Sequence, residues 1–261
     1  MDLGLTGKRA LVLSSSRGLG RGIAESLAAE GANVVLTARS EDKLKAAADA
    51  INARGKGRAS YIAADLAADV PGVHAKAVEA LGGPIDILIS NTGGPPAGTA
   101  LSVKPEAWTP QFQAMVLPVF TLAGLVLPDM QKNGFGRIVI VASSGVIQPI
   151  PNLVMSNALR SSILGWAKTL SAEVAKDGIT VNMILPGRIE TDRTGELDEA
   201  NAKRLGKTKD EVAAASVAQI PAGRYGEVRE FGDVACFLAS ERAGYVTGSM
   251  IRVDGGATRS V

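Results

Sequence analysis

The chain has 261 residues, 46% of them hydrophobic and 4% aromatic, and its 28 basic and 26 acidic side chains leave a net charge of +2. Scattered, nearly balanced charge and few aromatic rings exclude a typical nucleic-acid-binding surface, so we expect no nucleic-acid partner. The single cysteine, Cys236, excludes an intrachain disulfide, and the first residues carry no apolar signal segment, which together predict a cytoplasmic protein.

Short β-branched runs alternate with longer helical segments along the whole chain. Strands are predicted at residues 10–13, 33–37, 59–63, 85–89, 137–141, 180–185 and 249–253, and helices at residues 20–30, 41–53, 108–132, 153–176 and 227–239. Strands that are apolar on both faces and separated by helices form parallel sheets covered on two sides. The sequence therefore predicts an α/β fold, a Rossmann-type doubly wound parallel seven-stranded sheet, with residues 1–261 as a single domain.

A glycine-bearing turn follows the first predicted strand and opens directly into a helix. Its residues of interest are Ser14, Ser16, Arg17, Gly18, Leu19 and Gly20. Such a turn presents backbone N–H groups and a helix N-terminus to an anion, and its glycines allow close approach of a phosphate. Ser14 stands where the first glycine of a G-x-x-x-G-x-G turn is usual, so an ordinary strand-to-helix turn is the alternative.

The end of the second predicted strand bears on the choice of dinucleotide. Arg39 follows this strand, and no acidic residue is present there to hold an NAD ribose 2′-hydroxyl. Arg17 and Arg39 would place two guanidinium groups near the adenosine ribose, where their forks match a 2′-phosphate. The pattern favours NADP(H) over NAD(H), and the alternative is a pair of solvated surface arginines.

The third and fourth predicted strands end in residues that suit the rest of a nucleotide. Asp65 and Leu66 follow the third strand and are expected at the adenine edge. Asn91 and Gly93, within Asn91-Thr92-Gly93-Gly94, form a glycine-lined turn beside the cofactor. The later apolar run at residues 116–127 is too short to cross a bilayer, so we expect a buried helix or a subunit interface there and no membrane partner.

One segment, residues 188–224, departs from the alternation of strands and helices. It is polar, charged and irregular, with Gly195, Gly206 and Gly223 along it. Its position after a strand end predicts a lid over a substrate, and a solvated helical insertion is the alternative.

Several motifs together resemble the short-chain dehydrogenase/reductase family. They are the glycine turn, Asn91-Thr92-Gly93, Ser143, Pro186-Gly187 and the carboxy-terminal segment at residues 245–256. The resemblance runs from about Leu5 to Ala257 and is greatest to a divergent branch similar to 3-oxoacyl-(acyl carrier protein) reductase. It implies the strand order 3-2-1-4-5-6-7, a homotetramer built from two helices and the last strand, and a small carbonyl or alcohol substrate.

The same resemblance assigns the nicotinamide end of the site. Pro186, Gly187 and Ile189 would flank the nicotinamide, and Thr191 would hold its carboxamide, although each could be a plain turn residue. No metal site is expected.

The family's catalytic tetrad of Asn, Ser, Tyr and Lys falls on Met115, Ser143, Ser156 and Arg160, so the resemblance implies that only the serine is kept. Serine is a far weaker acid than tyrosine, and arginine stays protonated. We therefore take Ser143, Ser156 and Arg160 as candidate catalytic residues, with Arg160 also able to bind the ribose. Ser156 and Arg160 are four residues apart on a predicted helix and share a face.

Two functions follow from this substituted centre. The first is an NADP(H)-dependent oxidoreductase that interconverts a carbonyl and a secondary alcohol, slowly, with water as the final proton source. The alternative is a catalytically impaired dinucleotide-binding regulator or scaffold. The tyrosines at 61, 225 and 245 are not expected to reach the nicotinamide, and His74 is expected at the surface.

Overall fold

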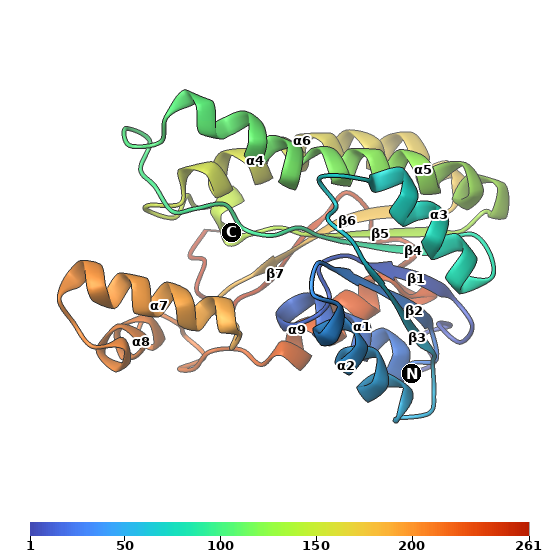
Figure 1. Ribbon diagram of the computed structural model, residues 1–261, viewed down its shortest axis with the longest axis horizontal. Helices are drawn as coiled ribbons and strands as arrows, with labels where there is room; N and C mark the ends of the chain where they lie inside the picture. Colours follow the sequence, from blue (N-terminus) through green and yellow to red (C-terminus); the bar gives the residue numbers. More distant parts are fainter. Residues whose placement is uncertain (261) are drawn as a thin grey trace.

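The computed structural model describes residues 1–260, and strands and helices alternate along most of the chain (Figure 1). The strands are β1 (Arg9–Val12), β2 (Asn33–Ala38), β3 (Ala59–Ala63), β4 (Ile87–Asn91), β5 (Gly136–Val141), β6 (Ile179–Pro186) and β7 (Met250–Val253). The α-helices are α1 (Gly18–Ala29), α2 (Glu41–Asn52), α3 (Val70–Leu81), α4 (Trp108–Met115), α5 (Leu117–Asn133), α6 (Val154–Val174), α7 (Asp192–Leu205), α8 (Lys209–Val217) and α9 (Val228–Leu238).

The seven strands form one parallel sheet in the order β3-β2-β1-β4-β5-β6-β7. This confirms the predicted fold class and the strand order that the resemblance implied. Strand β4 begins at Ile87 instead of residue 85. The Asp86 carboxylate, just before the strand, binds the backbone N and the guanidinium of Arg9 at 2.9 Å each, which anchors β4 beside β1.

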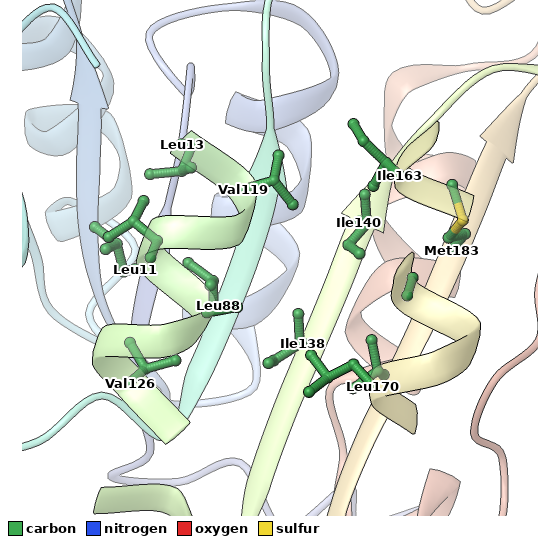
Figure 2. Close-up of a cluster of buried hydrophobic side chains, with 14 of the residues drawn as sticks. Leu11, Leu13, Leu88, Val119, Val126, Ile138, Ile140, Ile163, Leu170 and Met183 are labelled. Atoms are coloured by element: carbon green, nitrogen blue, oxygen red, sulfur yellow. The ribbon is translucent and has the colours of Figure 1, made fainter. Parts of the chain in front are cut away.

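Helices cover both faces of the sheet, as expected for strands that are apolar on both sides (Figure 1). Helices α3, α5 and α6 cover one face, and α1, α2 and α9 cover the other. Figure 2 shows part of the first core, where Val119 and Val126 of α5 and Ile163 of α6 meet strand residues such as Leu88 and Ile140. These two cores hold the strand ends in fixed relative positions, which is what a site built from those ends requires.

The predicted helix at residues 108–132 is two helices in the structure. Helix α4 ends at Met115 and α5 begins at Leu117, with Val116 between them and Pro118 in the first turn of α5. Proline lacks the N–H that a continuous helix would need, so it begins a new helix. By length and composition the stretch Pro105–Asn133, which contains an 18-residue window with a mean hydropathy of 1.5, could cross a membrane. Here Val119 and Val126 instead lie buried against the sheet, as the core of a globular domain does.

The segment at residues 188–224, whose sequence is irregular, is largely helical, as the alternative of a helical insertion expected. It contains α7 and α8, which lie together beyond the carboxyl ends of the strands (Figure 1). Thr191 and Thr208 cap the two helices, and Gly206 ends α7 with a φ of 64°. Side-chain caps satisfy helix N–H groups locally, so a polar sequence forms helices here without a wide apolar face. We call residues 188–224 the lid, a role that stays a prediction.

Candidate cofactor and active site

The predicted site residues meet at one edge of the sheet, where the parallel strands end. Ser14 follows β1, Arg39 follows β2, Asn91 ends β4 and Ser143 lies just after β5. Asn91 pairs in register with Val141, and its Nδ2 donates to the backbone O of Ser14 at 3.3 Å. The structure therefore brings together residues that are far apart in the sequence.

The turn between β1 and α1 is shaped to receive an anion. Gly18 has a φ of 57°, and Ser14 has a φ of 47°, which is uncommon for a residue other than glycine. The N-cap residue Arg17 makes no side-chain cap, and the first turn of α1 contains no acidic residue. Within residues 1–260 its leading N–H groups thus lack side-chain partners, as a helix that binds a phosphate requires. A Cβ on Gly20 would lie 2.5 Å from the Ser14 carbonyl O, so only glycine fits there.

Ser15, which the sequence analysis did not single out, fixes this turn to β2. It is fully buried, and its hydroxyl donates to Val12 O at 2.7 Å and accepts from Thr37 N at 3.0 Å. Thr37 lies near the end of β2, so Ser15 also sets the distance from the turn to Arg39. The neighbouring serines of the turn gave no sequence signal for which one would be buried.

The two arginines predicted to bind a 2′-phosphate differ in their surroundings. The Arg17 guanidinium is 2.9 Å from the carboxylate of Asp192 and 3.7 Å from that of Glu196, both on α7. Arg39 is exposed and makes no ion pair within residues 1–260. The structure thus leaves Arg39 free at this end of the site, whereas Arg17 contacts the lid.

The residues after β3 sit at the margin of the site. Asp65 is exposed, and its carboxylate accepts a hydrogen bond from the backbone N of Ala67 at 3.0 Å. Leu66 is half-buried against the core that contains α5. Leu19 and Ser16 in the glycine turn are also half-buried, which leaves part of each available to a ligand.

Arg160 lies at the centre of the site, with 7% of its surface exposed. Its Nη1 donates to Val141 O at 2.9 Å, and its Nη2 is 3.3 Å from both Thr92 O and Gly93 O. Its buried Nε has no hydrogen-bond partner within the described residues. Burial without a nearby carboxylate lowers the pKa of Arg160 to about 10, so the side chain stays a cation at neutral pH.

Two candidate hydroxyls come from segments that carry or bind this cation: Ser156 is on the same helix, and Ser143 follows Val141, whose carbonyl binds Arg160. Ser156 is buried one helical turn before Arg160 on α6, and its hydroxyl makes no hydrogen bond within residues 1–260. The Ser143 hydroxyl accepts from Gly145 N at 3.0 Å, which leaves its proton free to donate. The amide of Asn157 closes the intervening loop through both backbone groups of Ile150, at 3.2 and 3.0 Å.

Met115, the last residue of α4, contacts the residue that follows β4. Its side chain is 2% exposed, and its backbone carbonyl accepts from the Thr92 hydroxyl at 3.3 Å. The carbonyl released by the break between α4 and α5 is therefore bound by protein.

The residues after β6 approach the site from the lid side. Pro186 pairs with Val253 of β7, and Gly187 N donates to Val253 O at 2.9 Å. A Cβ on Gly187 would lie 2.6 Å from Asp254, so the close approach of these chains needs glycine. Ile189 is 4% exposed and bridges to Gly226.

Thr191 joins the lid directly to the glycine turn. Its hydroxyl caps α7 by accepting from Thr194 N at 3.2 Å, and its methyl carbon is 3.6 Å from the Cβ position of Gly18. The hydroxyl predicted to hold a carboxamide is thus engaged in the helix cap.

Other groups able to donate a proton lie elsewhere. Tyr225 donates to the buried Asp198 carboxylate at 2.9 Å, Tyr245 is fully exposed, and Tyr61 lies on β3. His74 is half-buried on α3, rather than fully at the surface as expected, and burial lowers its pKa. No cluster of metal-binding side chains occurs within the part of the chain that the structure describes.

A small cavity of about 120 Å³ lies between the lid and the ends of β6 and β7. Its charged walls are paired internally: Arg188 binds the Asp198 carboxylate at 2.6 Å, and Arg224 binds that of Glu230 at 2.6 Å. Hydrogen bonds from Arg224 and from the backbone lower the pKa of Glu230 to about 2. The first pair lies within the lid, and the second joins the end of the lid to α9.

The amino-acid sequence of the chain is similar to those of known proteins. Residues 13–258 match a family model described as enoyl-(acyl carrier protein) reductase. The 3-oxoacyl-(acyl-carrier-protein) reductase FabG of Escherichia coli (strain K12) is 38% identical over 252 residues, which cover 96% of this chain and 97% of the relative. The oxidoreductase UcpA of Salmonella typhimurium is 34% identical over 258 residues, covering 97% and 95%.

Solved structures agree with these sequence matches. L-sorbose reductase from Gluconobacter frateurii, complexed with NADPH and L-sorbose, superposes with a TM-score of 0.92 at 33% identity and covers all of both chains. YwfH, an NADPH-dependent reductase involved in bacilysin biosynthesis, gives a TM-score of 0.91 at 29% identity, over 97% of this chain and 100% of that one.

Proposed function

The chain belongs to the short-chain dehydrogenase/reductase family, and on that premise we propose that it is an NADP(H)-dependent oxidoreductase that interconverts a carbonyl and a secondary alcohol. The observation that carries the proposal is the meeting, at one sheet edge, of an uncapped glycine turn and a buried cation on the helix that also carries Ser156. The first element suits a dinucleotide phosphate, and the second suits a polarised carbonyl oxygen.

NADP(H) fits the residues at the phosphate end. The turn containing Ser14, Gly18 and Gly20 would hold the pyrophosphate on the N–H groups of α1. Arg39 is free to bind a ribose 2′-phosphate, and Arg39 and Ser40, instead of a carboxylate, directly follow β2. The NADPH named for the sorbose reductase and for YwfH supports this choice. Bound NADPH would supply the hydride to the carbonyl carbon.

The polar centre would orient and polarise the substrate oxygen. The Ser143 and Ser156 hydroxyls have protons to donate; Ser156 shares α6 with Arg160, and Ser143 is two residues after Val141, whose carbonyl binds Arg160. Donors fixed before the reaction stabilise developing negative charge without reorganisation. Because Arg160 is held by backbone carbonyls and stays charged, it acts as a fixed cation and passes on no proton. The proton that completes the alcohol would come from water.

The alignment implied by the family resemblance puts Ser156 and Arg160 at the Tyr and Lys positions and Met115 at the Asn position. The Thr92 hydroxyl donates to the Met115 carbonyl, and backbone carbonyls accept from the Arg160 guanidinium. These contacts contain no chain of groups that could pass a proton to the substrate. We therefore propose slow turnover, with the non-catalytic dinucleotide-binding regulator or scaffold as the second function.

One measurement separates the two functions. The whole chain is mixed with NADPH and a panel of small ketones and diketones, and with NADP⁺ and secondary alcohols, and cofactor absorbance is followed. Steady turnover that is lost in the Ser143→Ala, Ser156→Ala double variant supports the oxidoreductase. NADPH binding without turnover on any substrate favours the regulator.

A homotetramer is part of the proposal. Exposed apolar side chains lie on the surfaces where the resemblance expects contacts: Leu117 on α5 is 41% exposed, and Met250 on the edge strand β7 is 41% exposed. Phe120 of α5 and Trp166 of α6 stack with ring centroids 4.5 Å apart. Apolar surface at a sheet edge and across two helices is typical of subunit contacts. Light scattering at micromolar concentration checks the mass, and a monomer would contradict this assignment.

A further inference from the structure

Arg17 joins the phosphate turn to the lid through ion pairs. Its guanidinium lies 2.9 Å from the Asp192 carboxylate and 3.7 Å from that of Glu196, across a sequence separation of 175 residues for the shorter pair. All three side chains are at least half exposed, so these pairs form and break easily. Beside them the Thr191 methyl packs on Gly18, which puts the start of α7 directly against the turn.

A bound phosphate would be a second partner for the Arg17 guanidinium. Arg17 follows β1 and Arg39 follows β2, the neighbouring strand, so both can reach a phosphate bound over these two strand ends. Arg39 has no ion pair to give up within residues 1–260, but Arg17 has its charge offset by two carboxylates. A phosphate dianion that takes Arg17 must displace them or tolerate their negative charge.

We propose that Asp192, assisted by Glu196, is a specificity-determining residue of the cofactor site: it competes with the ribose 2′-phosphate of NADP(H) for Arg17. This rests on the proposed function. NAD(H) has no 2′-phosphate and leaves the pair of Arg17 and Asp192 intact. The pair therefore reduces the preference for NADP(H), and 2′-phosphate binding loosens the contact between the lid and the turn.

The first test compares the wild-type chain with Asp192→Asn in calorimetric titrations with NADPH and with NADH. An exposed ion pair of this kind corresponds to roughly a two- to fivefold change in affinity, so NADPH should bind the variant more tightly by that factor while NADH is unchanged. The matched control is Asp210→Asn, which removes an exposed acid from the first turn of α8 that does not contact Arg17. Equal effects of the two variants on NADPH would overturn the proposal.

A double-mutant cycle tests whether Arg17 carries the effect. In an Arg17→Met background, Asp192→Asn should leave the ratio of NADPH to NADH affinity unchanged. If the same gain in the ratio persists without Arg17, Asp192 acts by simple repulsion and the competition is refuted. If neither dinucleotide binds the wild-type chain, both the proposed function and this inference fail. A retained NADPH preference with no response to Asp192→Asn refutes the inference alone.

A fragment of the cofactor isolates the effect on the lid. In the wild type, 2′,5′-ADP should increase tryptic cleavage after lid residues such as Arg204 and Lys207, whereas 5′-AMP should not. Asp192→Asn should be cleaved at the faster rate without any ligand. Cleavage that is the same in all these conditions would show that the pair does not hold the lid, and would overturn the loosening that we infer.

Discussion

The arginine at the phosphate end of the site and the arginine at its catalytic centre differ in burial and in hydrogen bonding. Arg39 is exposed and free of ion pairs within the described residues, so its charge is available to a ligand. Arg160 is 7% exposed, and three backbone carbonyls accept hydrogen bonds from its Nη1 and Nη2. The same residue type is therefore left exposed in one place and holds strand ends together in the other. We therefore expect that cofactor binding at this site is better preserved than proton transfer to the substrate.

The largest effect is expected from restoring a proton donor near Arg160, which would remove the difference between the two ends of the site. The triple change Met115→Asn, Ser156→Tyr and Arg160→Lys should raise the rate of NADPH-dependent ketone reduction by at least about tenfold, because a positioned general acid contributes on the order of 10²–10⁴. Initial rates on small ketones and diketones measure it.

NADPH titration and thermal unfolding of the triple variant serve as controls for folding. A wild type with brisk activity that Ser156→Ala or Arg160→Ala abolishes, and that the triple change also destroys, would show an independent serine and arginine mechanism. The claim of impaired chemistry would then be wrong.

The second prediction concerns stability. Arg160→Ala should lower the free energy of unfolding by about 2–3 kcal/mol, because it leaves buried carbonyls without donors and removes a packed side chain. Arg39→Ala, at the exposed end, should change it by less than about 0.5 kcal/mol. Urea unfolding of both variants measures the difference. Equal stability of the Arg160 variant and the wild type would mean that the desolvation of the buried charge cancels its hydrogen bonds.

The third prediction tests whether Arg39 sets the cofactor preference at the phosphate end. Arg39→Asp should reverse the cofactor preference, with a change of about tenfold or more in the ratio of NADPH to NADH affinity, since a charge-assisted fork is worth roughly 1.5–3 kcal/mol. Calorimetry with both cofactors checks it. NADH binding the wild type as tightly as NADPH would contradict the cofactor assignment from the start.

The smallest expected effect lies in the backbone of the same turn. Ser14 has a φ of 47°, a region in which side chains other than glycine are strained. Ser14→Gly should therefore raise the free energy of unfolding by up to about 1 kcal/mol, less the entropy that glycine adds to the unfolded chain. Asn152→Gly, at a φ of 62° in another loop, is the control and should change less because asparagine tolerates this conformation. A loss of stability in Ser14→Gly would show that the serine side chain is needed in the turn.

The sequence by itself determined the sheet and the place of the site on it. Strands with two apolar faces, such as residues 137–141, must be covered on both sides, and parallel strands need helical crossovers. Their carboxyl ends then meet at one edge, which is why Ser14, Asn91 and Ser143 were predictable as neighbours. Residue type and spacing also placed Ser156 and Arg160 on one face of a helix.

Only the tertiary structure decided which groups are free to act. The sequence shows that Arg17 lies in the turn, but not that it meets Asp192, 175 residues away. Nor does it show that carbonyls of β5 and of the loop after β4 bind Arg160, or that Ser15 rather than its neighbours is buried. Hydrogen bonds and ion pairs depend on distances of a few ångströms between elements that pack independently, and a linear pattern of polar and apolar residues does not encode those distances.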